Sequence, residues 1–163
     1  MKDPSSLSRC GLSRQKAAYL TDLAAHFLDG RVRTRKLADM NDDEIIDALT
    51  CVNGIGRWTV EMFLIFVLNR PDVLPVDDLG LREAMRGVYG LKARPGATEL
   101  TAVAERWRPY RTVATWYLWR GLSEARARKS QISGSKSQKR SRVQREQSQT
   151  QKSRRRLRPH LSV

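Results

Sequence analysis

Two adjacent carboxylates, Asp77 and Asp78, are candidates for chemistry. They follow Leu74-Pro75-Val76, which we expect to be extended because proline biases the residue before it away from helical backbone. A carboxylate can stabilise positive charge that develops next to it during a reaction and can help to position water. Either aspartate can instead cap a helix that runs to about Tyr89, and from the residues alone capping is the favoured interpretation.

A short glycine turn, Gly54-Ile55-Gly56, lies upstream between two helical patterns. Glycine permits backbone angles closed to other residues and places no side chain between the backbone and a ligand. A helix predicted to start directly after the turn leaves several backbone N–H groups free for a phosphate, and the Thr59 hydroxyl can assist. Such contacts would hold DNA without reading its sequence. An ordinary turn between two helices is the simpler alternative.

Helical patterns account for the segments that must position these residues. Capping side chains and apolar spacing predict six helices, over about 14–29, 42–53, 57–69, 78–89, 98–107 and 110–127. Ser13 is the expected cap of the first helix, and Asn41 or Asp42 that of the second. The third is apolar nearly all round, so we expect it to be the buried central helix. Residues 31–40 carry four basic side chains and are expected to be a solvated linker. Since no convincing alternating strand pattern is present, the predicted fold is all-α.

The positive charge is concentrated near the C-terminus. Lys and Arg number 31 against 17 Asp and Glu in 163 residues, a formal net charge of +14, and 13 of the basic residues lie in 124–163 with only two acidic ones. From about residue 130 the chain is mostly Ser, Gln, Lys and Arg, so we expect a disordered basic tail. That tail either contacts nucleic acid non-specifically, serves as a nuclear address, or is simply solvated.

Several classes of protein are disfavoured. Cys10 and Cys51 belong to no Cys-x-x-Cys pair or Cys/His cluster, so we expect reduced thiols and neither zinc nor an iron–sulfur cluster. The polar N-terminus is unlike a signal peptide, and the longest apolar run, residues 62–68, is too short to span a bilayer. His26 and His160 carry no recognisable site, and a surface or incidental role is expected. These features predict a soluble intracellular protein with no membrane partner.

Four motifs, in order along residues 10–123, resemble the helix–hairpin–helix (HhH-GPD) DNA glycosylase superfamily, in its 3-methyladenine DNA glycosylase II branch. Residues 49–59 look like the hairpin, and Pro75-Val76-Asp77-Asp78 resembles the loop that carries the catalytic aspartate. Residues 107–120 are similar to the closing helix of that branch, and Gly11 to Ala17 also fit it. Each motif is weak alone, but the ordered combination is specific.

The resemblance implies a monofunctional DNA glycosylase of base excision repair. Such an enzyme hydrolyses the N-glycosidic bond of an alkylated purine flipped out of duplex DNA and leaves an abasic site. The catalytic role falls on Asp78, and one carboxylate suffices because a cationic base leaves without strong acid help. Trp58 stands where strand-cutting members carry a Schiff-base lysine, which implies simple hydrolysis.

Trp58 and Trp119 resemble the family's pocket walls, which would stack on a flipped cationic base. From helical spacing alone, a core position is about as good an interpretation for these two, and it is the favoured one for Trp107 and Trp116.

At the hairpin, the resemblance implies DNA contacts and a structural Na⁺ or K⁺ held by main-chain carbonyls, with no other cofactor required. The expected DNA-binding residues are Gly54, Ile55, Gly56, Arg57 and Thr59. The expected cation ligands are the carbonyls of Thr50, Val52 and Ile55.

The expected organisation has three parts: a loop over 1–12, a glycosylase domain over 13–128 and the tail over 129–163. Family members carry further helices before the matching stretch, so we expect 13–128 to be the C-terminal portion of the usual fold. The predicted partner of this monomer is double-stranded DNA with alkylated bases, in the cytoplasm and nucleoid or in a nucleus. Alternatives are a non-catalytic DNA-binding fragment and an incomplete product without stable function.

Overall fold

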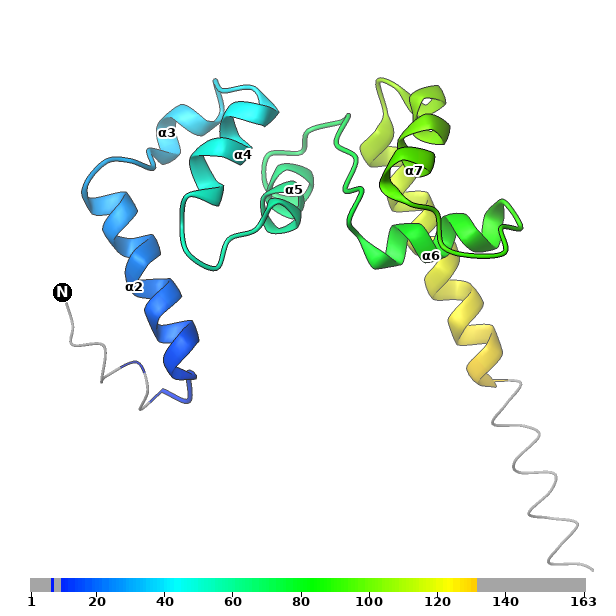
Figure 1. Cartoon of the computed structure of the whole chain (residues 1–163), viewed down its shortest axis with the longest axis horizontal. Helices are drawn as coiled ribbons and strands as arrows, with labels where there is room; N and C mark the ends of the chain where they lie inside the picture. The colour runs from blue at the N-terminus through cyan, green and yellow to red at the C-terminus, as the bar shows by residue number, and fades with distance from the viewer. Residues whose placement is uncertain (1–6, 8–9, 132–163) are drawn as a thin grey trace, which may run out of the picture. The chain divides into compact units, whose positions relative to one another are not determined.

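The computed structural model describes residues 7 and 10–131, which contain helices and no strand (Figure 1). The predicted all-α fold is therefore confirmed for this part of the chain. Its helices are α2 (Arg14–Leu28), α3 (Thr34–Leu37), α4 (Asp42–Thr50), α5 (Arg57–Phe66), α6 (Leu79–Val88), α7 (Ala97–Ala104), the 3₁₀ turn η1 (Glu105–Trp107) and a last helical stretch over 111–131.

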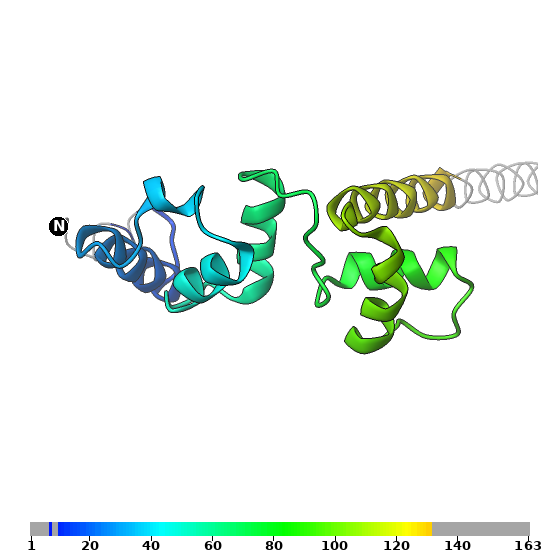
Figure 2. The same cartoon turned by 90° about the horizontal axis from the view of Figure 1, so that it is seen from above.

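The described residues divide into two units after Trp119. Within the first unit, α4 and α5 lie side by side and are joined by the glycine turn, as both views of the chain show (Figure 1, Figure 2). This arrangement is a helix–hairpin–helix, with the hairpin formed by residues 51–56.

Side-chain caps set the start of α2 and α4 in the first unit. Ser13 accepts a hydrogen bond from Lys16 N at the start of α2. Asn41, rather than Asp42, caps α4 and forms a reciprocal capping box with Glu44. These caps satisfy backbone N–H groups that have no partner within a helix. The helix starts near residues 13 and 41 are therefore confirmed.

Two clusters of buried side chains hold the first unit together. The first is centred on α4 and α5 and consists of Val32, Leu37, Ile45, Ile46, Leu49, Val52, Val60, Leu64, Ile65 and Val73. The second joins α6 to α7 through Leu81, Met85 and Leu100, with Leu74, Val76, Val103, Trp107 and Leu118 packed against them. The predicted core position of Trp107 is confirmed, since this half-buried indole packs on the second cluster.

The connection from α5 to α6 is held by polar contacts with the start of the last helical stretch. The Arg111 guanidinium donates to Asp72 through Nε at 2.7 Å and Nη2 at 2.9 Å. Thr112 is buried, donates to Arg70 O at 2.7 Å and accepts from Val73 N at 2.9 Å. Because these contacts join distant segments, they fix the path of the chain, and this path places residues 75–78 at the start of α6.

Three expectations about α5 and Trp116 are wrong. Helix α5 ends at Phe66 rather than near 69 and buries only one face, leaving Trp58, Phe66 and Val67 exposed. A ten-residue helix beside one main partner cannot cover every apolar side chain. Trp116 is also exposed. Its core position was predicted wrongly, because helical spacing alone does not show which face of a helix has a partner to pack against.

The predicted linker over 31–40 is partly structured. Val32 and Leu37 are buried, and Leu37 belongs to the short helix α3. His26 is buried as well, with Nδ1 2.9 Å from the carbonyl oxygen of Asp22. A surface position for His26 was therefore predicted wrongly, because the residue lies on the side of α2 that is buried together with Ala17.

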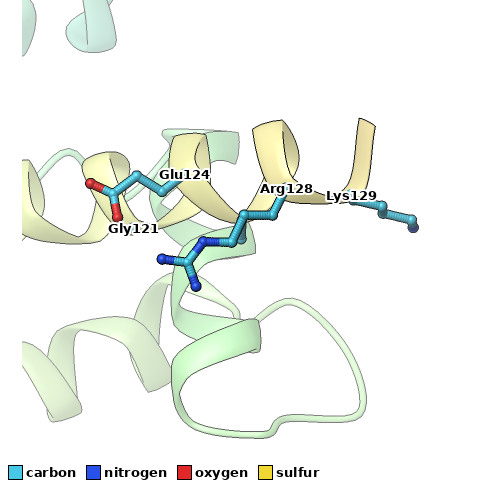
Figure 3. A pocket seen from close by; sticks show the side chains of 5 residues that line it. Gly121, Glu124, Arg128 and Lys129 are labelled. Carbon is cyan, nitrogen blue, oxygen red and sulfur yellow. The ribbon is translucent and has the colours of Figure 1, made fainter. Parts of the chain in front are cut away.

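The second unit is described only as helix, over residues 120–131. Figure 3 shows an open hollow on this helix, lined by Gly121, Glu124, Ala125, Arg128 and Lys129. Because one helix alone bounds this hollow, we assign it no function. Most of the predicted 129–163 tail and of the predicted 1–12 loop lies outside the described residues. In the described part, no helix is both long and apolar enough to cross a membrane.

Candidate functional site

Two indole side chains from distant parts of the first unit and one nearby backbone N–H converge on the carboxylate of Asp78. Oδ1 accepts a hydrogen bond from Trp119 Nε1 at 2.8 Å and another from the Leu81 backbone N–H at 2.5 Å, which caps α6. Oδ2 accepts from Trp58 Nε1 at 3.0 Å. Since both oxygens have N–H donors, the carboxylate is held in one orientation at a helix N-terminus, where negative charge is favoured.

The neighbouring aspartate has a different role. Asp77 is exposed and forms a salt bridge with Arg82 at 2.8 Å. Local sequence could not separate the two carboxylates, because each had suitable spacing to cap α6. The structure separates them, since the cap and both indole contacts belong to Asp78.

An aromatic frame supports one side of this site. The ring of Phe66 stacks on Trp119, with centroids 5.9 Å apart and planes at 12°. Phe66 also meets Trp116 edge-on at 6.1 Å. Such pairs restrain the rings they join, so Phe66 helps to hold the Trp119 indole against Asp78. Sequence reasoning missed Phe66, because one apolar residue in an apolar helix gives no separate signal.

Gly80 leaves the space that these contacts need. A Cβ atom at this position would lie 3.0 Å from Asp78 Oδ1 and 3.5 Å from Cδ1 and Nε1 of Trp119. A side chain here would therefore press on both the carboxylate and the indole. Sequence reasoning missed this role as well, although a glycine in the first turn of a predicted helix is a usable signal of close approach.

The hairpin glycines have different functions in the fold. Gly54 has φ of +86°, and a Cβ there would lie 2.3 Å from the ring of Tyr19 on α2. The Asn53 N–H also donates to Asp22 Oδ2 at 2.8 Å, which fixes the hairpin to α2. Gly54 is thus required by backbone angle and by packing.

Gly56 is not required in this way. It caps α5 with φ of −91°, and a Cβ would meet nothing within 4 Å. The expectation that both glycines supply unusual backbone angles is therefore wrong for Gly56. Its lack of a side chain instead leaves open space in front of the α5 N-terminus.

Donors for an anion gather at that open space. Among the described residues, the backbone N–H groups of Gly56, Arg57 and Trp58 have no acceptor, as expected for the first turn of a helix. The Arg57 and Thr59 side chains on the same turn are exposed. Since Trp58 belongs to this turn and also contacts Asp78, the hairpin and the carboxylate are structurally linked.

The hairpin carbonyls predicted to hold a cation are partly free. In the described part of the chain, the carbonyls of Thr50 and Ile55 accept no hydrogen bond, while that of Val52 accepts one from Ile55 N at 3.1 Å. Oxygen donors of this kind suit a hard cation, so the residues fit the expected Na⁺ or K⁺.

A buried acid, Glu61, lies one turn along α5 from Arg57. Burial raises the pKa of its carboxyl group above 4.5, against the opposing effect of the hydrogen bond and charge of Arg57. The negative charges of Asp77 and Asp78 add to the rise. Because the sequence of α5 is apolar nearly all round, helical spacing does not show whether position 61 is buried. Sequence reasoning therefore gave no role to Glu61.

Comparison with known proteins identifies the family. Residues 2–109 match the model of the HhH-GPD superfamily base excision DNA repair protein. The chain therefore belongs to the HhH-GPD superfamily, as its motifs predicted.

Individual relatives agree with this assignment. DNA-3-methyladenine glycosylase 1 of Schizosaccharomyces pombe is 42% identical over 112 residues, which are 68% of this chain and 49% of the relative. A solved structure of 3-methyladenine DNA glycosylase from that organism, in complex with abasic DNA, superimposes with a TM-score of 0.65 at 40% identity, over 72% of this chain and 57% of that one. A DNA-3-methyladenine glycosidase from Bacillus halodurans gives 0.69 at 36% identity, over 74% and 56%. The chain thus spans about half the length of these relatives.

Proposed function

We propose that this chain carries the catalytic aspartate of a monofunctional DNA glycosylase that removes alkylated purines, of the 3-methyladenine type, from duplex DNA. The observation that carries the proposal is the carboxylate of Asp78, held by the indole N–H groups of Trp58 and Trp119 at 3.0 and 2.8 Å. The names of the relatives support the same substrate class.

Asp78 would act by electrostatic stabilisation. As the bond between sugar and base breaks, the sugar gains positive charge, and a fixed carboxylate nearby lowers the energy of that state. Orientation by three N–H donors removes the need to reorganise the carboxylate during the reaction. An alkylated purine is already cationic, so it can leave without a second, acidic carboxyl group.

Trp58 would form the open wall of the base site. Its side chain is 47% exposed, whereas one face of Trp119 is already covered by Phe66. An exposed indole can stack on a flipped cationic base by cation–π attraction while its N–H holds Asp78. The first turn of α5 reads Arg57-Trp58-Thr59 and contains no lysine to form a Schiff base, so the expected products are a free base and an uncut abasic strand.

The hairpin would bind a phosphate of the same DNA. The free N–H groups of Gly56, Arg57 and Trp58, the open space at Gly56 and the Thr59 side chain support this role. A Na⁺ or K⁺ on the carbonyls of the hairpin would add positive charge near that phosphate. In this proposal the hairpin holds the DNA backbone, and the start of α6 presents the carboxylate of Asp78.

The test incubates methylated duplex DNA with the full chain and with Asp78→Asn, and measures free methylpurines by chromatography. We expect release by the wild type and a large loss in the variant, with DNA binding retained. Full activity of Asp78→Asn would refute the catalytic assignment. Duplex binding by a folded wild type without any base release would favour the non-catalytic DNA-binding alternative.

A further inference from the structure

Glu61 is a buried acid that the proposed chemistry does not use. Only 3% of its side chain is exposed, and Oε1 accepts a hydrogen bond from Arg57 Nε at 3.1 Å. Oε2 is buried and accepts no hydrogen bond from the residues that the structure describes. The other buried residues of α5 are Val60, Leu64 and Ile65, all apolar.

The stability of the fold does not explain a carboxylate at this position. A buried oxygen without a donor destabilises the folded state, and replacing a buried ion pair by a well-packed apolar group is often neutral or stabilising. The raised pKa of Glu61 agrees, because it reflects the cost of keeping a charge in this environment. An apolar residue of similar size would serve the core at least as well.

What Glu61 contacts is the arginine of the hairpin. Arg57 is the first residue of α5, directly after Gly56, and its side chain is 55% exposed. The bond to Glu61 occupies only Nε, and neither Nη group has a partner among the described residues. A guanidinium held in this way still presents N–H groups that can bind a phosphate.

We propose that Glu61 is a positioning residue, which holds the Arg57 guanidinium at the hairpin for contact with a DNA phosphate. This inference rests on the proposed role of the hairpin in binding DNA. A free arginine side chain loses rotamer freedom when it binds, and an arginine already held by Glu61 loses less. The expected gain in DNA affinity is about two- to tenfold, the usual range for ordering one such side chain.

The test is a double-mutant cycle on the full chain. Fluorescence anisotropy measures the binding of a duplex with a tetrahydrofuran abasic-site analogue by wild type, Glu61→Met, Arg57→Ala and the double variant. We expect Glu61→Met to weaken binding about two- to tenfold in the wild-type background and to have no effect once Arg57 is alanine. Arg57→Ala should also lower the slope of log affinity against log salt by about one.

Two further measurements separate positioning from a structural role. Thermal unfolding of Glu61→Met should occur at or above the wild-type temperature, because an unsatisfied buried oxygen is removed. Glu61→Gln keeps an oxygen that can accept from Arg57 Nε, so it should bind DNA more tightly than Glu61→Met. The control is Glu83→Gln on α6, where the acid pairs with Arg86 and Arg94 away from the hairpin; its DNA affinity should equal that of the wild type.

Clear outcomes would overturn the proposal. These are unchanged binding by Glu61→Met, equal losses in both Arg57 backgrounds, or a Glu61→Met chain that melts well below the wild type. The failure of the proposed function looks different: a wild type that binds the duplex and depends on Arg57 but releases no methylpurine would refute the glycosylase and leave the positioning role intact. No duplex binding by a folded wild type would overturn both.

Discussion

The indole of Trp119 donates a hydrogen bond of 2.8 Å to Oδ1 of Asp78, a residue 41 positions earlier in the chain. Trp58 makes the matching contact to Oδ2 from 20 positions before Asp78. The two tryptophans therefore act on the carboxylate through their N–H groups, a relationship that is separate from any stacking on a base. Removing an N–H while keeping an aromatic ring distinguishes the two roles.

Trp119→Phe should reduce base release by about tenfold to a hundredfold, since a hydrogen bond to a charged group contributes about 1.5–3 kcal/mol. The ring can still stack on Phe66, so the fold should be retained. Release of methylpurine under single-turnover conditions measures the effect. Trp116→Phe is the matched control, because Trp116 has no bond to Asp78 among the contacts described; equal losses in the two variants would contradict a specific role for the Trp119 N–H.

Gly80→Ala should lower activity while leaving most of the stability intact. The added methyl group would lie 3.0 Å from Asp78 Oδ1, so the carboxylate or the α6 N-terminus must shift by a few tenths of an ångström. Gly87→Ala on the same helix is the control, because a Cβ there meets nothing within 4 Å. Alanine should stabilise α6 at position 87 by about 0.5–1 kcal/mol with unchanged base release. Undiminished activity of Gly80→Ala would argue against a need for close approach.

The two hairpin glycines should respond differently to alanine. Gly54→Ala should destabilise the fold by more than about 2 kcal/mol, because it combines a positive φ with a clash against Tyr19. Gly56→Ala should melt close to the wild type and bind DNA more weakly, since its methyl group enters the space proposed for a phosphate. Thermal unfolding and anisotropy with the abasic-site duplex measure the two effects. Normal affinity of Gly56→Ala would count against that phosphate position.

The stability of the wild type relative to Glu61→Gln should fall as the pH rises. The pKa of Glu61 in the folded chain lies above its ordinary value of 4.5, chiefly because of burial, so the folded state favours the protonated acid. This contribution to stability is fully present below pH 4.5 and is lost as the pH passes through the raised pKa. Arg57, Asp77 and Asp78 are the charged groups that act on Glu61, and none is altered in the variant. Denaturant unfolding of both chains between pH 4 and 8 tests this; parallel stability curves would contradict it.

Local sequence was sufficient for features that depend on near neighbours. The cap at Ser13, a helix start at Asn41 or Asp42, the turn after α4 and the all-α fold follow from residues within a few positions of each other. The ordered motifs also predicted the HhH-GPD superfamily, which the family match confirms. Segment boundaries were less predictable, because burial against distant residues decided that Leu37 joins the core and that α5 ends at Phe66.

Only the tertiary structure decided the contacts between segments that are far apart in sequence. Asp77 and Asp78 are chemically identical and adjacent, and only the positions of Trp58 and Trp119 assign both indole N–H groups to Asp78. The burial of Glu61 and the open space at Gly56 likewise depend on which surfaces the helices bring together. Capping and periodicity are properties of a single turn of chain, whereas the orientation of a side chain toward a partner 20 or 41 residues away exists only once the helices have packed.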